Sequence, residues 1–198
     1  MPDPLHLSLW FPDFSEKDMM LRTLSVLRQF PFSQERPGVS YLAVHPVSWN
    51  EPTVLERRFI PPATPDEAVH VASDLLHEDY AYAFDVAWDL WTAEGESRQW
   101  TLVPQRVRIV TQGNEFEDAA WEGTGNIDID FGLDTVFLYE TLQLTPNDEE
   151  RVCANVARLV DFTNKIEKNV GTSGRLLWSD SDQDNLAQKL IARLQKVQ

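Results

Sequence analysis

The chain has 198 residues, of which 32 are acidic and 17 basic, so its formal net charge at neutral pH is −15. Hydrophobic residues make up 42% and aromatic residues 11% of the chain, which excludes a disordered or collagen-like protein. A negative charge of this size opposes contact with phosphate backbones and anionic lipids, so we expect neither nucleic acid nor a membrane as a partner. The single cysteine excludes an internal disulfide and an all-cysteine zinc site.

The charge is unevenly distributed along the chain. Eight basic and five acidic residues follow Glu150, which leaves nine basic and 27 acidic residues, a net charge of −18, in positions 1–150. The first residues lack the basic region and long apolar run of a signal peptide, and no apolar stretch approaches the roughly 20 residues of a membrane span. We therefore expect a cytoplasmic protein with an acidic body and a basic C-terminal part.

The first half of the chain is predicted to follow a β-α-β-β-α-β order. The segment Thr64-Pro65-Asp66-Glu67 combines an N-cap threonine, a first-turn proline and a capping-box glutamate, the strongest helix start in the chain. Residues 80–91 alternate between two sets of side chains with a period of two, which is typical of a strand. This order predicts a ferredoxin-like core, a fold pattern that implies no activity. The predicted strands are 5–11, 39–47, 53–60 and 80–91, and the predicted helices begin after Ser15 and Thr64.

The second half is predicted to extend that core with two antiparallel strands, 99–111 and 126–139, separated by an acidic loop at 112–125. Two amphipathic helices then follow, one starting at Thr145-Pro146 and one capped by Ser181. We therefore expect a single globular α+β domain over 1–198. In this prediction residues 1–140 form the sheet core, and 141–198 form an appended helical hairpin, a C-terminal two-helix unit.

Three tryptophans lie beside acidic residues and suggest a docking surface. Tryptophan is enriched where proteins bind one another, and acidic neighbours would attract a basic protein partner. The alternative is that these tryptophans cover the edge of the sheet. The candidate partner-binding residues are Trp91, Trp100, Trp121, Glu117, Asp118 and Glu122.

Asp128, Asp130 and Asp134 are the best candidates for a metal site. A strand places Asp128 and Asp130 on one face, and closely spaced carboxylates can hold Mg²⁺ or Mn²⁺. The favoured alternative is a face of ion pairs across neighbouring strands. In this arrangement the strand with Arg106 and Arg108 lies between two strands that carry aspartates. These aspartates are Asp85 and Asp89 on one side and Asp128 and Asp130 on the other.

The common catalytic and nucleotide-binding signatures do not occur in the chain. No P-loop and no dinucleotide-binding glycine pattern is present, and no cofactor is expected. The sequence favours a non-enzymatic interaction protein whose acidic surface recognises a basic protein partner. The alternative is an enzyme, or a protein that binds a small ligand or a metal, using the Asp/Arg face of the sheet. A third possibility is a homodimer through the C-terminal helices, weakened by salt.

Overall fold

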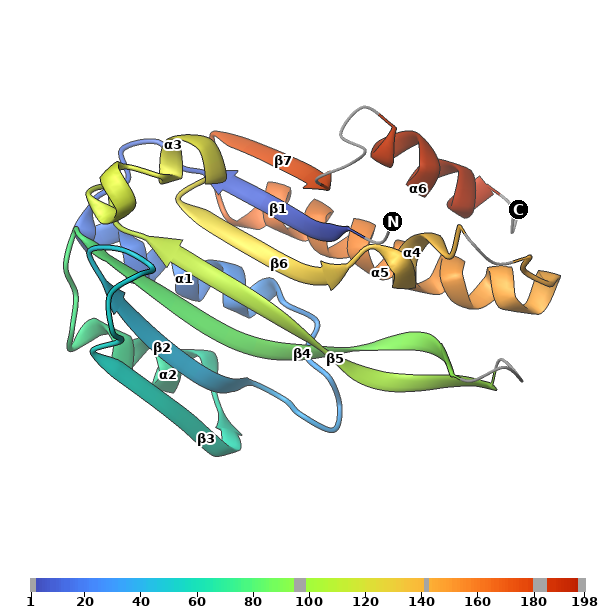
Figure 1. The fold of residues 1–198 in the computed structure, drawn as a ribbon, viewed down its shortest axis with the longest axis horizontal. Helices are drawn as coiled ribbons and strands as arrows, with labels where there is room; N and C mark the ends of the chain where they lie inside the picture. The colour runs from blue at the N-terminus through green and yellow to red at the C-terminus, as the bar shows by residue number, and fades with distance from the viewer. Residues whose placement is uncertain (1–2, 95–98, 141–142, 180–184, 196–198) are drawn as a thin grey trace.

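The computed structural model describes residues 3–94, 99–140, 143–179 and 185–195. Within these residues the protein is an α+β fold built on one open, antiparallel sheet with the strand order β3-β2-β4-β5-β6-β1-β7. Helices α1, α2 and α5 lie behind the sheet in Figure 1, and α6 lies beside the end of β7. Among the described residues, no long helix lies on the face of the sheet toward the viewer. The sheet therefore has one covered face and one open face.

The elements have the following bounds. The strands are β1 (Pro4–Trp10), β2 (Val39–Pro46), β3 (Leu55–Ala63), β4 (Tyr80–Glu94), β5 (Gln99–Gln112), β6 (Ile127–Leu133) and β7 (Gly174–Ser179). The α-helices are α1 (Glu16–Gln29), α2 (Pro65–Ser73), α3 (Trp121–Thr124), α4 (Thr135–Leu138), α5 (Pro146–Asn169) and α6 (Leu186–Gln195). A 3₁₀ turn, η1, spans Phe116–Asp118.

The helix starts predicted at the two Thr-Pro segments are confirmed. The backbone N–H of Glu67 donates to the Thr64 hydroxyl, and the backbone N–H of Thr64 donates to the Glu67 carboxylate. Thr145 and Asp148 form the same reciprocal pair at the start of α5. Each box satisfies backbone N–H groups that have no partner inside the helix. These two helices therefore begin at the residues that the sequence indicates.

The covered face holds the main hydrophobic core. Even-numbered residues of β4 point toward the helices, and Tyr82, Phe84 and Trp88 are fully buried there. The Trp88 ring stacks on Phe131 of β6 at 5.2 Å between centroids. Phe162 of α5 belongs to the same core, so α5 covers the sheet directly. The period of two predicted over residues 80–91 is thus realised as one apolar side and one side of smaller or charged residues.

The strand order differs from the predicted ferredoxin-like core. Such a core places its first strand inside the sheet, next to the third and fourth strands. Here β1 pairs with β6 and β7, while β2 pairs with β3 and β4. The reason is that β4, β5 and β6 pair in succession as antiparallel neighbours and separate β2 from β1. The order of elements along the chain matched the pattern, but the pairing did not.

The C-terminal part also differs from the predicted helical hairpin. Helix α5 is part of the sheet's own core, and the six-residue strand β7 lies between α5 and α6 and pairs with β1. The strand predicted over 126–139 ends at Leu133, because the chain turns there into the short helix α4. The predicted cap Ser181 lies outside the described residues. The C-terminal part therefore completes the sheet as well as covering it.

The pairing of β4 with β2 ends at Val86, so in the described part of the chain the outer half of β4 has no neighbouring strand on that side. Side chains and a loop take the place of that strand. The carbonyl of Ala87 accepts from the N–H of Ser33 at 2.7 Å, and the carbonyl of Asp89 accepts from the Arg158 guanidinium. The amide of Asn155 bonds both backbone groups of Trp91 at 2.8 Å. The edge of β4 is therefore hydrogen-bonded at successive outward-facing residues.

The open face is covered at one end only. Phe116, in the turn η1, is fully buried against the small side chains of Ala43, Ala81 and Ala83. Small residues on β2 and β4 leave room for this ring to approach the sheet. Away from the loop that carries Phe116, the middle of the open face carries charged side chains from β4, β5 and β6: Asp85, Arg106, Arg108, Asp128 and Asp130.

Candidate functional site

Charged residues from neighbouring strands meet on the open face. In the register of β4 and β5, Asp85 lies opposite Arg108 and Ala87 opposite Arg106. In the register of β5 and β6, Arg108 lies opposite Asp130. The predicted cross-strand arrangement of aspartates and arginines is therefore confirmed for these residues. Asp89 differs, since it lies opposite Pro104 and its carboxylate accepts from the backbone N–H of Gln34 at 3.0 Å.

Asp85 is the centre of this charged group. Its carboxylate accepts from Arg108 Nε at 2.8 Å and from Arg108 Nη2 at 3.2 Å, a bidentate pair. Arg106 Nε lies 3.0 Å from the second carboxylate oxygen. Asp85 is 8% exposed, and the hydrogen bond to it raises the pKa of the Arg108 guanidinium. One carboxylate therefore fixes two guanidinium groups, and this group keeps one excess positive charge.

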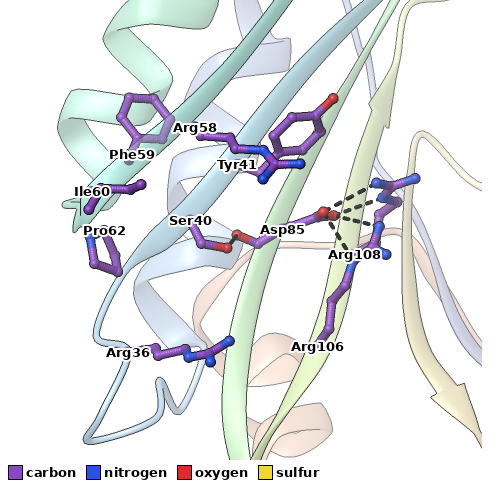
Figure 2. A pocket seen from close by; sticks show the side chains of 10 residues that line it. All are labelled: Arg36, Ser40, Tyr41, Arg58, Phe59, Ile60, Pro62, Asp85, Arg106 and Arg108. Carbon is purple, nitrogen blue, oxygen red and sulfur yellow. Dashed lines mark hydrogen bonds and ion pairs between the residues drawn. The ribbon is translucent and has the colours of Figure 1, made fainter.

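A hollow of about 660 Å³ opens beside this ion pair, between β3 and β5 (Figure 2). Its volume is within the usual range for small-molecule sites. Figure 2 shows Arg36 reaching it from the loop before β2, and Arg58 from β3 on the opposite side. We call this hollow the arginine pocket. Its lining residues are Arg36, Ser40, Tyr41, Arg58, Phe59, Ile60, Pro62, Asp85, Arg106 and Arg108.

The arginine pocket is positively charged in a strongly acidic chain. Four arginines and one aspartate line it, which gives a net charge of +3. Among the described residues, neither Arg36 nor Arg58 has an ion pair with a carboxylate. Burial and the nearby Glu56 carboxylate raise the pKa of the Tyr41 phenol, so this hydroxyl stays protonated at neutral pH. The lining therefore offers many N–H and O–H donors and a single carboxylate.

The wall of the pocket formed by β3 adds apolar side chains to Arg58. Ile60 is 92% exposed, and Phe59 and Pro62 lie beside it in Figure 2. A second hollow of about 570 Å³ lies around the same strand and shares Arg58, Phe59, Ile60 and Pro62 with the arginine pocket. We call it the β3–α2 hollow, because its other lining residues come from β3 and α2: Arg57, Pro61, Ala63, Glu67, His70 and Val71.

The predicted metal ligands are only partly brought together. Asp128 and Asp130 share the open face, but Asp128 bonds His6 Nδ1 at 2.9 Å and Asp130 accepts from the N–H of Gly132 at 2.8 Å. Asp134 follows the end of β6 and accepts from the N–H of Asp3, and burial raises the pKa of its carboxyl. Within the described residues, no three His, Cys, Asp or Glu side chains form a group that could hold a metal ion. The metal site stays a prediction.

The predicted partner-binding tryptophans lie in two separate regions. Trp91 and Trp100 lie near the outer end of the β4–β5 hairpin, with the Arg151 guanidinium within 6 Å of both rings. Trp100 also donates from its indole to Asp148 at 2.6 Å. Trp121 lies at the other end of these strands, where its indole donates to the carbonyl of Asn114. The two groups therefore cannot form one docking surface.

The acidic residues of the predicted surface all lie with Trp121. The carboxylate of Glu117 accepts from the backbone N–H of Trp49 at 2.8 Å, so it has a structural partner. Asp118 and Glu122 are exposed. This loop keeps the acidic character that the sequence predicts, without Trp91 and Trp100.

Sequence reasoning found Asp85, Arg106 and Arg108 but missed Arg36, Tyr41 and Arg58. The signal for Arg58 lay in the β2–β3 hairpin, where Tyr41 and Arg58 are opposite each other. Arg36 lies in an irregular loop, where no periodicity indicates the direction of a side chain. The second half of the pocket therefore depended on strand pairing and on a loop.

In the part of the chain that the structure describes, no helix combines the length and apolarity that a membrane span needs.

Comparisons with other proteins add no information on this site. Comparison with protein-family models, with curated proteins and with solved structures found no match, so the pocket is interpreted from its own geometry.

Proposed function

We propose that this protein binds the oxyanion group of a ligand, a phosphate or a carboxylate, in the arginine pocket. One observation carries the proposal: four arginines from three separate segments converge on one hollow, and two of them lack an ion-pair partner among the described residues. Five of the nine basic residues in positions 1–150 line this pocket or the adjoining β3–α2 hollow. An anion would supply the missing negative charge.

The arrangement of the arginines supports this proposal chemically. A guanidinium has five N–H donors in a planar fork, which fits the oxygens of phosphate and carboxylate groups. Asp85 holds Arg106 and Arg108 in place, so less side-chain entropy is lost when a ligand binds. Arg36 and Arg58 then provide charge from the other sides of the pocket. The expected ligand chelates two or more of these groups at once.

Isothermal titration calorimetry with inorganic phosphate, pyrophosphate and citrate tests the proposal. We expect binding of at least one of them, and a loss of about tenfold or more in affinity for Arg58→Ala, since a charge-assisted hydrogen bond contributes roughly 1.5–3 kcal/mol. Lys17→Ala is the matched control, because Lys17 is an exposed cation on α1. No binding of any of the three anions, or an equal loss in the control, would refute the proposal.

A basic protein partner at the loop around Trp121 is the second candidate function. The exposed carboxylates of Asp118 and Glu122 beside the partly exposed Trp121 favour it. A titration with an oligolysine peptide, monitored by tryptophan fluorescence, should show binding that weakens at about 0.5 M salt. An Asp118→Asn, Glu122→Gln variant should bind less tightly than the native chain. Unchanged binding by this variant would remove the candidate.

The other partner predictions remain proposals. One is the third possibility, a homodimer through the C-terminal helices that salt weakens, and the other is the absence of contact with nucleic acid. Light scattering at low and high salt tests the first, and a filter-binding titration with duplex DNA and with RNA tests the second. A monomer at low salt, or retention of either nucleic acid, would contradict the corresponding proposal.

A further inference from the structure

The edge of β3 lies open beside the arginine pocket. β3 and β7 are the outer strands of the sheet, and β3 is the longer, with nine residues. Alternate residues of an edge strand point their N–H and C=O groups away from the sheet. Within the described residues, no side chain bonds the backbone of Leu55–Ala63, whereas the outer half of β4 is bonded by Ser33, Asn155 and Arg158. The fold covers the free edge of β4 and leaves the edge of β3 open.

The two hollows are both arranged around this edge. The arginine pocket lies on the open face, and the β3–α2 hollow lies toward helix α2. Arg58, Phe59, Ile60 and Pro62 line both. Successive side chains of an extended chain point to opposite faces of a sheet. A strand added beside β3 would therefore direct alternate side chains toward the two hollows.

The chemistry of the two hollows differs. The arginine pocket, with a net charge of +3 from its lining, suits an acidic side chain. The β3–α2 hollow has a smaller net charge of +1, from Arg57, Arg58 and Glu67, and its Glu67 carboxylate is already bonded to Thr64. The apolar groups that line it are Phe59, Ile60, Pro61, Pro62, Ala63 and Val71. Ile60, between the hollows, is 92% exposed and would be covered by a strand added there. A small inorganic anion would use neither the free backbone nor this isoleucine.

We propose that an extended segment of a protein partner, with acidic and apolar side chains in alternation, adds to the sheet along β3. Pairing would span Leu55–Ile60 and stop at Pro61 and Pro62, which have no N–H to donate. The main-chain hydrogen bonds would supply affinity and the two hollows specificity, as in other cases of strand addition. This inference rests on the proposed function, because it names the source of the anion that the arginine pocket binds.

The test uses the full chain and a capped peptide in which three glutamates alternate with three valines. We expect binding by calorimetry and slower amide hydrogen exchange over residues 55–60, with exchange in β7 unchanged. Two further peptides carry methyl groups on the backbone nitrogens, one at the valines and the other at the glutamates. Because alternate residues point their N–H groups to the same edge of a strand, each peptide has one edge blocked. We expect one of them to bind about tenfold more weakly or worse. Arg58→Glu should abolish binding, while the matched variant Lys17→Glu should bind within about twofold of the native chain.

The outcomes separate this inference from the proposed function. Binding of citrate or pyrophosphate without binding of the peptide would overturn the inference and leave the anion site standing. Peptide binding with unchanged exchange in β3 and equal affinity for both methylated peptides would also overturn it, because attraction of charges alone would then explain the binding. Failure of every anion and of the peptide would remove the proposed function and this inference together.

Discussion

β3 and the outer half of β4 are both strand edges without a neighbouring strand, yet the protein treats them differently. Backbone groups of Ala87, Asp89 and Trp91 are bonded by other parts of the chain, and the N–H of Ala93 donates to the Tyr139 hydroxyl. β3 has no such bonds within the described residues, and the hollows around it contain arginines and an exposed isoleucine.

This difference predicts that the covered edge of β4 contributes to stability and that the open edge of β3 contributes to binding. The bonds to β4 connect the sheet to α5 across the main core, so their loss should lower the free energy of unfolding. The charged and exposed residues of β3 pack against little, so their replacement should change binding and leave stability nearly intact. Arginines and prolines on an edge strand also oppose uncontrolled pairing between copies. Four substitutions, at Asn155, Asp85, Asp148 and Arg58, test this separation.

Asn155→Ala should have the largest effect. Asn155 is 2% exposed and bonds both backbone groups of Trp91 and the carbonyl of Val136. Removing its amide leaves buried backbone groups unsatisfied, so we expect a loss of about 2–4 kcal/mol in the free energy of unfolding, measured in urea. A loss below about 1 kcal/mol would show that the covered edge of β4 does not depend on this side chain.

Asp85→Asn should lower the stability less than Asn155→Ala does, and it should strengthen the binding of pyrophosphate. It removes the charge that holds Arg106 and Arg108, and because both guanidiniums are partly exposed we expect a loss of only about 1 kcal/mol in the free energy of unfolding. The pocket gains one positive charge, so pyrophosphate should bind several-fold more tightly. Weaker pyrophosphate binding would mean that fixing the arginines matters more than the added charge.

Asp148→Asn should reduce stability in a pH-dependent way. Hydrogen bonds from the N–H and hydroxyl of Thr145 lower the pKa of Asp148, with a contribution from the Trp100 indole. The stabilisation that comes with a lowered pKa is fully present above the ordinary pKa of a carboxyl group. It is lost as the pH falls through the lowered pKa of the folded protein. We expect the variant to be about 0.5–1 kcal/mol less stable at pH 7 and equal to the native chain near pH 2. Urea unfolding at several pH values measures the difference, and a constant gap would contradict this account.

Arg58→Ala should change stability least, by less than about 0.5 kcal/mol, although it is expected to weaken anion binding about tenfold. Arg58 is exposed and has no ion pair among the described residues. Thermal unfolding without and with pyrophosphate checks both parts. A large loss of stability without ligand would place Arg58 among the structural residues and end the contrast between the two edges.

Part of the candidate site could be predicted from the sequence. The alternation in residues 80–91 places Asp85 on the face opposite Trp88, and the same period in the following strand places Arg106 and Arg108 together. Because β4 and β5 are consecutive antiparallel strands, their charged faces coincide. Arg58 was not placed in the same way, although it lies opposite Tyr41 in the regular part of the β2–β3 register. Its position on the pocket depends on how this hairpin packs beside β4, which the strand pattern does not record.

The predictions of the strand order and of the C-terminal part failed where distant segments meet. The ferredoxin-like order was wrong because the element sequence does not specify which strands pair. The short strand β7 was missed because six residues after a glycine break carry little periodicity. The candidate surface of Trp91, Trp100 and Trp121 was divided because a long hairpin keeps its two ends apart.

The order of residues is enough to predict the local elements: the helix starts at Thr64 and Thr145, and the long alternating strand β4. These depend on interactions between residues a few positions apart, which the order of residues records directly. Only the tertiary structure decided the strand order, the covering of the β4 edge by α5, and the meeting of Arg36 and Arg58 with Arg106 and Arg108. Those features depend on contacts between distant segments, which form only when the whole sheet assembles around its core.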